Sequence, residues 1–205
     1  MRVRIVVFDG MDDLDVVGPY SVLGMAGRAG LGVSVGLTAL GGRPHATTVG
    51  GLPLPAGPWA PQDADVLIVP GGGYASGAAP GVRAEIADGR LPGALAAAVR
   101  PDLVLASVCT GALLLAAAGL VTGRPCTTHH RAVGDLVAAG GRHVEARVVD
   151  DGDLVTSGGV TSGLDLALWL VERFRGADAA GVVQRAMEYE RREPLWLVEP
   201  AGTTK

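Results

Sequence analysis

The chain is poor in aromatic residues and in cysteine, and it has no long apolar run. Phe, Trp and Tyr make up 4% of the 205 residues, so Val, Leu, Ile and Ala must fill the core. No apolar run reaches the roughly 18 residues that a membrane-spanning helix needs, so we expect no membrane partner. The two cysteines, Cys109 and Cys126, lack the ligand set of a zinc site, so we expect no structural zinc.

Clustered positive charge is also missing. The formal net charge is -4, and the 17 Lys and Arg residues are scattered along the chain, so we expect no nucleic-acid partner. The first residues, MRVRIVVFDG, are typical of a strand and show no secretory signal. These features predict a cytoplasmic protein whose cysteines stay reduced.

The length and composition favour one compact domain. Hydrophobic residues make up 48% of the chain, and the 32 glycines follow no triplet period, which excludes a collagen-like protein. A chain of this length can bury one substantial core. We therefore predict a single domain over residues 1–205, with a core at residues 2–191 and a short C-terminal tail.

Short apolar segments alternate with segments of helical character. Strands are predicted at 2–8, 33–40, 64–70, 102–108 and 146–157. Helices are predicted at 14–29, 91–100, 110–118, 132–139, 162–175 and 178–191. Residues 41–61 are rich in Gly and Pro and are interpreted as a hairpin with surface loops. The alternation predicts an α/β fold with a mainly parallel sheet that helices cover on both faces.

Cys109 lies where a predicted strand runs directly into a predicted helix. Thr110 and Gly111 follow it, and small neighbours of this kind permit the sharp turn of a nucleophile elbow. A thiol at a helix N-terminus is favoured as thiolate, so we expect a lowered pKa and reactivity at neutral pH. The alternative is a buried small hydrophobic residue, which is the role we predict for Cys126.

A second predicted strand end carries residues that can join this site. Gly71, Gly72 and Gly73 follow a buried strand, and the amides of Gly72 and Gly73 are candidate oxyanion donors together with the Thr110 N–H. A flexible turn is the alternative.

Asp15 follows the first predicted strand within the apolar run Leu-Asp-Val-Val. A carboxylate among apolar neighbours needs a raised pKa or a dedicated partner, and it can share a proton with Cys109. Asp12 and Asp13 are interpreted as solvated or helix-capping acids.

Six segments in consistent order resemble the DJ-1/PfpI superfamily, and within it the isonitrile hydratases. These segments are LDVVGP at 14–19, VPGGG at 69–73, SVCTGALLLAAAGL at 107–120, TTHH at 127–130, GGVTSGLDLAL at 158–168 and EYE at 188–190. The resemblance implies a flavodoxin-like three-layer α/β/α fold, a homodimer, and no metal or organic cofactor. It assigns catalysis to Asp15, Cys109 and Thr110.

The residue after the cysteine separates branches of the superfamily. PfpI-type peptidases have a histidine there, whereas this chain has Thr110, as the isonitrile hydratases do. The resemblance therefore favours hydration of a small isonitrile to an N-substituted formamide over peptide cleavage. His130 stands where those hydratases tend to have an aromatic residue, and residues 190–193 also depart from their pattern, so the substrate pocket is expected to differ.

The remaining polar candidates have structural alternatives. His129 is interpreted either as a supporting or substrate-binding residue near Cys109 or as a partner in a structural hydrogen bond. His45, His130 and His143 are predicted to be exposed or structural. Thr161 and Ser162 lie at a predicted helix start, where capping is the first interpretation and pocket lining the second.

Two other functions use the same cysteine. Other branches of the superfamily act on reactive carbonyls such as methylglyoxal, and oxidation of Cys109 would suit a redox or ligand sensor. The superfamily fold also occurs fused to AraC-type DNA-binding modules. The chain ends at AGTTK soon after the last predicted helix, so we expect no such module here.

Overall fold

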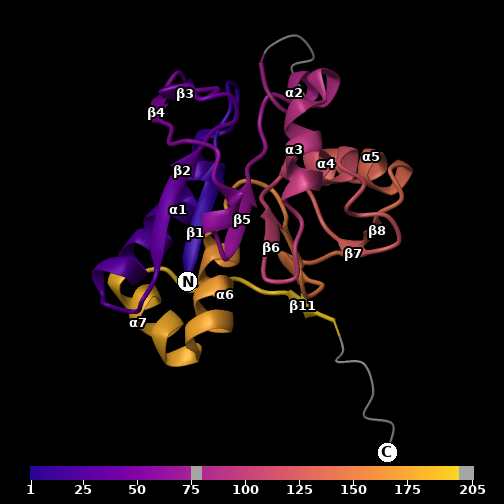
Figure 1. The fold of residues 1–205 in the computed structure, drawn as a ribbon. Coiled ribbons are helices and arrows are strands. Elements are labelled where there is room, and N and C mark those ends of the chain that lie inside the picture. The colour runs from indigo at the N-terminus through magenta and orange to yellow at the C-terminus, as the bar shows by residue number, and fades with distance from the viewer. Residues whose placement is uncertain (75–79, 199–205) are drawn as a thin grey trace, which may run out of the picture.

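Short apolar segments form the strands of a central sheet in the computed structural model, which describes residues 1–74 and 80–198 (Figure 1). Two strands at its centre are buried along their whole length, as expected of strands with helices on both faces. In the described part of the chain the sheet has seven strands: β1 (Arg2–Val6), β2 (Ser34–Thr38), β5 (Val66–Val69), β6 (Val104–Ser107), β9 (Val148–Asp150), β10 (Leu154–Ser157) and β11 (Leu195–Leu197).

The order of the strands is β11-β9-β10-β6-β5-β1-β2. β2, β1, β5, β6 and β10 are mutually parallel, and β9 runs antiparallel to β10. The parallel strands, numbered along the chain, have the 2-1-3-4-5 order of flavodoxin-like folds. The prediction of a mainly parallel, flavodoxin-like sheet is confirmed. In such a sheet the order reverses between β1 and β5, and ligands bind beyond the carboxyl ends of strands at that point.

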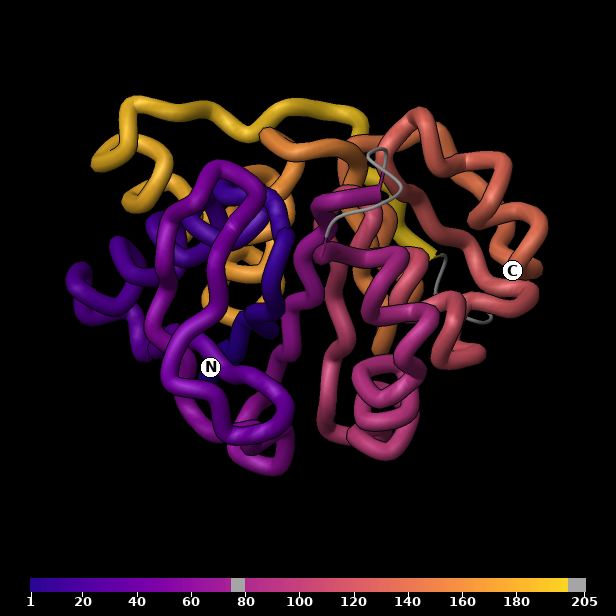
Figure 2. The backbone as a smooth tube through the Cα atoms, turned by 90° about the horizontal axis from the view of Figure 1, so that it is seen from above, coloured from indigo at the N-terminus to yellow at the C-terminus, as the bar shows by residue number. Residues whose placement is uncertain are grey.

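Helices cover both faces of the sheet, which confirms the three-layer arrangement. One layer consists of α1 (Asp13–Arg28), α6 (Ser162–Arg175) and α7 (Ala177–Met187). The other consists of α2 (Val82–Asp88), α3 (Arg90–Ala98), α4 (Gly111–Ala117) and α5 (Val133–Ala138). Figure 2 shows the segment after α7, in yellow, running across the molecule to join the sheet through β11. None of the helices in the described residues combines the length and apolar character that a membrane crossing requires.

Several short elements were not predicted, and others differ in their bounds. The predicted strand at 146–157 is the hairpin of β9 and β10, and the last predicted helix ends at Met187. The hairpin expected within 41–61 is present as β3 (His45–Thr47) and β4 (Pro53–Pro55). The elements without a prediction are α2, β8 (Arg142–His143), β11, η1 (Pro61–Asp63) and η2 (His130–Ala132). Cys126 lies in a further short strand, β7 (Pro125–Cys126). β11 lies within the predicted C-terminal tail, and residues 199–205 lie outside the described residues.

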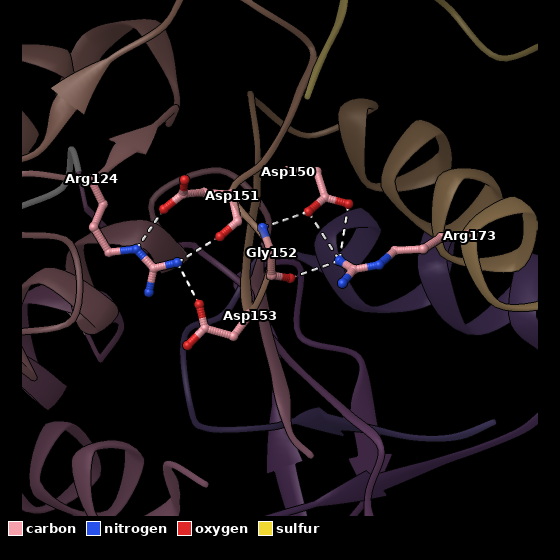
Figure 3. Close-up of polar contacts among 6 residues, drawn as sticks. All are labelled: Arg124, Asp150, Asp151, Gly152, Asp153 and Arg173. Carbon is pink, nitrogen blue, oxygen red and sulfur yellow. Dashed lines mark hydrogen bonds and ion pairs between the residues drawn. The ribbon is translucent and has the colours of Figure 1, made fainter. Parts of the chain in front are cut away.

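The turn between β9 and β10 is acidic and is held by two arginines (Figure 3). Arg124 donates to the carboxylates of Asp151 and Asp153, and Arg173 donates to Asp150 and to the carbonyl of Gly152. Leu154 lies opposite Leu105 near the start of β6, so this turn is at the edge of the sheet remote from Cys109.

Acidic residues at the start of α1 tie the helix to its surroundings. Asp12 is the N-cap and accepts hydrogen bonds from the N–H groups of Leu14 and Asp15, which confirms its capping role. Asp13 accepts from the Thr48 hydroxyl at 2.6 Å, and from a backbone N–H at position 50, so it anchors the loop of the β3–β4 hairpin.

Candidate active site

Three chain segments meet at the carboxyl ends of β1, β5 and β6. Asp15 lies on the first turn of α1 after β1, Gly71 follows β5, and Cys109 follows β6. The Gly71 N–H donates a hydrogen bond to Asp15 Oδ2 at 2.9 Å. The fold therefore brings together residues that are 56 positions apart, at the edge of the sheet where ligands are expected.

The backbone at Cys109 has the geometry of a nucleophile elbow. Its φ angle is 56°, in the left-handed region, and such a conformation costs on the order of 1–3 kcal/mol for a non-glycine residue. The Cys109 N–H lies 2.9 Å from the carbonyl of Gly158 and 3.2 Å from that of Ser157. The Thr128 hydroxyl donates to the Cys109 carbonyl at 2.8 Å. Contacts from distant segments thus hold the turn in place.

The glycine loop after β5 packs directly on the elbow. A Cβ atom at Gly111 would lie 2.1 Å from the Val69 carbonyl oxygen, and one at Gly71 would lie 2.5 Å from the Thr110 hydroxyl oxygen. Neither distance is compatible with a side chain. Glycine at both positions allows the loop to bring its amide against Asp15.

Asp15 is fully buried and has few polar partners. Its Oδ1 has no hydrogen-bond partner among the described residues. Burial, with a smaller effect from the charge of Asp12, raises the pKa of Asp15 to about 8, and interactions with Gly71 and Cys109 offset part of the rise. Of the two expectations from the sequence, a raised pKa or a dedicated partner, the structure favours the raised pKa, and the carboxyl group holds a proton at neutral pH.

The pKa of the Cys109 thiol is raised, and here the sequence-based prediction was wrong. Cys109 is 6% exposed, and burial together with the negative charge of Asp15 opposes ionisation of the sulfur. The N–H groups of Val160 and Thr110 and the Thr110 hydroxyl interact with the sulfur and offset only part of this effect. Because two adjacent charges repel in a buried site, the pair carries at most one negative charge at neutral pH.

The two glycines expected to donate to an oxyanion are placed differently. The Gly72 N–H donates to the Thr110 hydroxyl oxygen at 3.1 Å and is therefore already engaged. Gly73 lines a hollow of about 770 Å³ together with Gly10, Arg43 and Thr48. Val160, whose N–H interacts with the sulfur, was not predicted from the sequence. Val160 has a φ of 40°, which nothing in the identity of a β-branched residue predicts.

His129 and Thr161 make structural contacts. His129 Nδ1 accepts the N–H of Arg131 at 3.2 Å, as in the structural interpretation. Its ring lies against Gly159, where a Cβ would approach His129 Cδ2 to 2.6 Å. Partial burial and neighbouring positive charge lower the pKa of His129. Thr161 is the N-cap of α6, yet its side chain makes no capping bond and instead accepts from Arg147 at 3.1 Å, so the capping prediction fails for this residue.

The remaining candidates lie as expected. Cys126 is fully buried in the core, and His45, His130 and His143 are exposed.

Within residues 1–74 and 80–198, no three His, Cys, Asp or Glu side chains are grouped so that they could hold a metal ion.

Comparisons with known proteins agree with the fold and the motifs. The DJ-1/PfpI family model matches residues 1–173. An isonitrile hydratase of Pseudomonas putida is 33% identical over 198 residues, which are 95% of this chain and 81% of the relative. A deglycase of Pyrococcus abyssi is 31% identical over 157 residues, covering 77% of this chain and 89% of the relative. A THiJ/PfpI family protein of Pseudomonas syringae, known as a crystal structure, superposes with a TM-score of 0.79 at 30% identity, covering 94% of this chain and 76% of that one. The chain belongs to the DJ-1/PfpI family.

Proposed function

We propose that this protein adds water to an isonitrile and releases an N-substituted formamide, using Cys109, Asp15 and Thr110. The observation that carries the proposal is a fully buried carboxyl beside the buried cysteine of the elbow, where burial raises the pKa of Asp15 to about 8. Similarity to the isonitrile hydratase of Pseudomonas putida over 95% of the chain supports the substrate class.

The first step joins the sulfur to the terminal carbon of the isonitrile. Asp15 gives its proton to that carbon while the Cys109 sulfur forms the C–S bond. The S–H bond breaks, and its proton passes to Asp15, which ends the step neutral. The product is a thioimidate in which the carbon carries the sulfur, one hydrogen and a double bond to nitrogen.

Water resolves this thioimidate in the second step. The water oxygen adds to the carbon, Asp15 gives its proton to the nitrogen, and a water proton returns to Asp15. The C–S bond then breaks while the hydroxyl proton moves to the sulfur, which releases the formamide and restores the thiol. Every proton that Asp15 gives is replaced within the same step, so one carboxyl serves as acid and base.

Thr110 has the geometry to assist the sulfur. Its hydroxyl oxygen accepts the Gly72 N–H, so its own proton remains available to the Cys109 sulfur. This donor and the N–H groups of Thr110 and Val160 stabilise negative charge as the S–H bond breaks. For His129, Gly73 and Thr161 we propose no part in the chemistry, and only that they line the approach to this site.

A route in which Asp15 activates water directly is less well supported. A general base must be unprotonated, and burial keeps the Asp15 carboxyl protonated until about pH 8. The route through Cys109 instead uses Asp15 first as an acid, in the form that predominates at neutral pH.

Rapid-quench mass spectrometry with a small alkyl isonitrile tests the proposal. We expect an adduct on the peptide that contains Cys109, with the mass of the substrate, appearing before formamide. Thr110→Val should slow its formation, whereas Cys126→Ala leaves the catalytic thiol intact and serves as control. Full hydratase activity in Cys109→Ala would refute the mechanism.

A second candidate is chemistry on reactive carbonyls, which the similar deglycase of Pyrococcus abyssi favours. The same thiol would add to the carbonyl carbon of methylglyoxal. Parallel assays with an isonitrile and methylglyoxal distinguish the two activities, and we expect the higher kcat/KM with the isonitrile.

Redox sensing is the non-enzymatic alternative. Peroxide would oxidise Cys109 to sulfenic acid, but burial and a raised pKa disfavour the thiolate that this reaction needs. The homodimer implied by the family resemblance and the cytoplasmic location remain predictions, and sedimentation of the purified protein measures the first.

A further inference from the structure

The carbonyl of Cys109 is held by a residue outside the proposed catalytic set. Thr128 is 4% exposed and donates its hydroxyl to this carbonyl at 2.8 Å. In the first turn of α4, the N–H groups of Gly111 and Leu113 bond instead to the carbonyls of Val108 and Thr110. The Thr128 hydroxyl is thus the side-chain donor that satisfies the carbonyl of the strained residue.

The segment that carries Thr128 is itself fixed against the sheet. The N–H of Thr127 donates to the Thr156 hydroxyl oxygen on β10 at 2.8 Å, in a buried contact. β10 also leads to Ser157 and Gly158, whose carbonyls bind the Cys109 N–H. Thr128 therefore binds the Cys109 carbonyl and the end of β10 binds the Cys109 N–H, and the Thr127–Thr156 hydrogen bond joins these two segments.

The Cys109 carbonyl shares a peptide group with the Thr110 N–H. A trans peptide is planar, so its carbonyl and its N–H point in opposite directions. Fixing the carbonyl toward Thr128 fixes the N–H on the other side, where it interacts with the Cys109 sulfur. A hydrogen bond to the carbonyl also polarises the peptide and strengthens the N–H as a donor.

We propose that Thr128 is a positioning residue, which holds the carbonyl of Cys109 and thereby aims the Thr110 N–H at the reacting sulfur. This inference rests on the proposed role of Cys109 as the nucleophile, but not on the identity of the substrate. Removing one directly aimed donor costs on the order of 10²- to 10³-fold in other enzymes. Losing the alignment of a donor that remains present should cost less, about 10-fold.

Alkylation of Cys109 by iodoacetamide across a pH series, followed by peptide mapping, tests the inference without any substrate. In Thr128→Val we expect the rate at neutral pH to fall about 10-fold and its increase with pH to begin at a higher pH. Thr128→Ser keeps a hydroxyl and should restore the rate and the profile. Thr127→Val removes the adjacent buried hydroxyl and should leave both unchanged.

The outcomes separate this inference from the proposed function. If Thr128→Val alkylates with the rate and profile of the unmodified protein, the positioning role is wrong. It is also wrong if Thr127→Val produces the same change, because the effect would then be one of packing. If Thr128→Val does not fold, Thr128→Ala repeats the comparison. Absence of hydratase activity in the unmodified protein would refute the proposed function, and the alkylation data would still decide the role of Thr128.

Discussion

Asp15 on α1 and Asp165 on α6 are both fully buried, on helices that pack together, yet their surroundings differ. Asp165 accepts hydrogen bonds from Arg147 at 2.7 Å, from the Tyr189 hydroxyl at 3.0 Å and from the Arg192 N–H at 2.8 Å. Asp15 accepts one backbone N–H and has no cation as a hydrogen-bond partner in the described part of the chain.

The difference shows how one fold uses the same side chain in two ways. A cation and two further donors compensate the desolvation of Asp165, so its charge ties α6 to the segments around it. Asp15 lacks this compensation, so its carboxyl group avoids the cost of burying a charge by keeping its proton. A carboxyl that keeps its proton near neutral pH is suited to proton transfer, which is why uncompensated burial marks the candidate site.

The largest expected effect is on turnover. Asp15→Asn preserves the shape of the side chain but cannot donate its proton, so kcat for isonitrile hydration should fall by about 10³-fold, within the range for a general acid. Asp165→Asn should retain kcat per folded molecule. Steady-state kinetics at matched folded fractions measure both, and equal losses in the two variants would contradict the assignment of chemistry to Asp15.

The second effect is on stability, where the substitution at Asp165 should be more damaging than the one at Asp15. Asp165→Asn removes the buried charge that faces the partly exposed Arg147, and breaking an ion pair with one buried partner costs up to about 3 kcal/mol. Urea unfolding should therefore show a lower free energy of unfolding for this variant. Arg147→Met together with Asp165→Leu should recover much of the loss, and failure to recover any would argue against an uncompensated charge as its cause.

The third effect concerns the pH dependence of stability. Because the pKa of Asp15 is raised to about 8 in the folded protein, the folded state holds a proton that the unfolded chain releases near its ordinary pKa of 3.8. The free energy of unfolding should therefore decrease as the pH rises between these values. Asp15→Asn removes this penalty, so its free energy of unfolding relative to that of the unmodified protein should rise steadily from pH 4 to pH 8. A constant difference across the series would show that the pKa is not raised.

The smallest effect is expected in the acidic turn between β9 and β10 (Figure 3). Asp153 is 58% exposed and its partner Arg124 is 29% exposed, so solvent screens the pair. Asp153→Asn should change the free energy of unfolding by less than about 1 kcal/mol and leave kcat unchanged. Thermal unfolding at low and high salt checks this, and a loss as large as that of Asp165→Asn would mean that exposure is a poor guide to compensation.

The sequence predicts the sheet and the elbow better than it predicts the polar contacts of the site. Apolar strands alternating with helices predict the sheet, and small residues around Cys109 predict the elbow, because both depend on local composition. The raised pKa of Asp15 follows from its apolar neighbours. The pKa of Cys109 depends on how deeply tertiary packing buries the sulfur, and local sequence does not contain that quantity. The roles of Val160 and Thr128 depend on contacts with the elbow from distant segments, so neither was predicted.

The bonds that hold the elbow also determine when it can exist during synthesis. The N–H of Cys109 is held by residues 157 and 158, about fifty positions later in the chain, and its carbonyl by Thr128. A nascent chain that ends before β10 has the cysteine but not the contacts that keep its backbone left-handed. These contacts can form only once β10 has been synthesised and has packed beside β6, so shortened forms that lack β10 should have a cysteine with an ordinary backbone conformation.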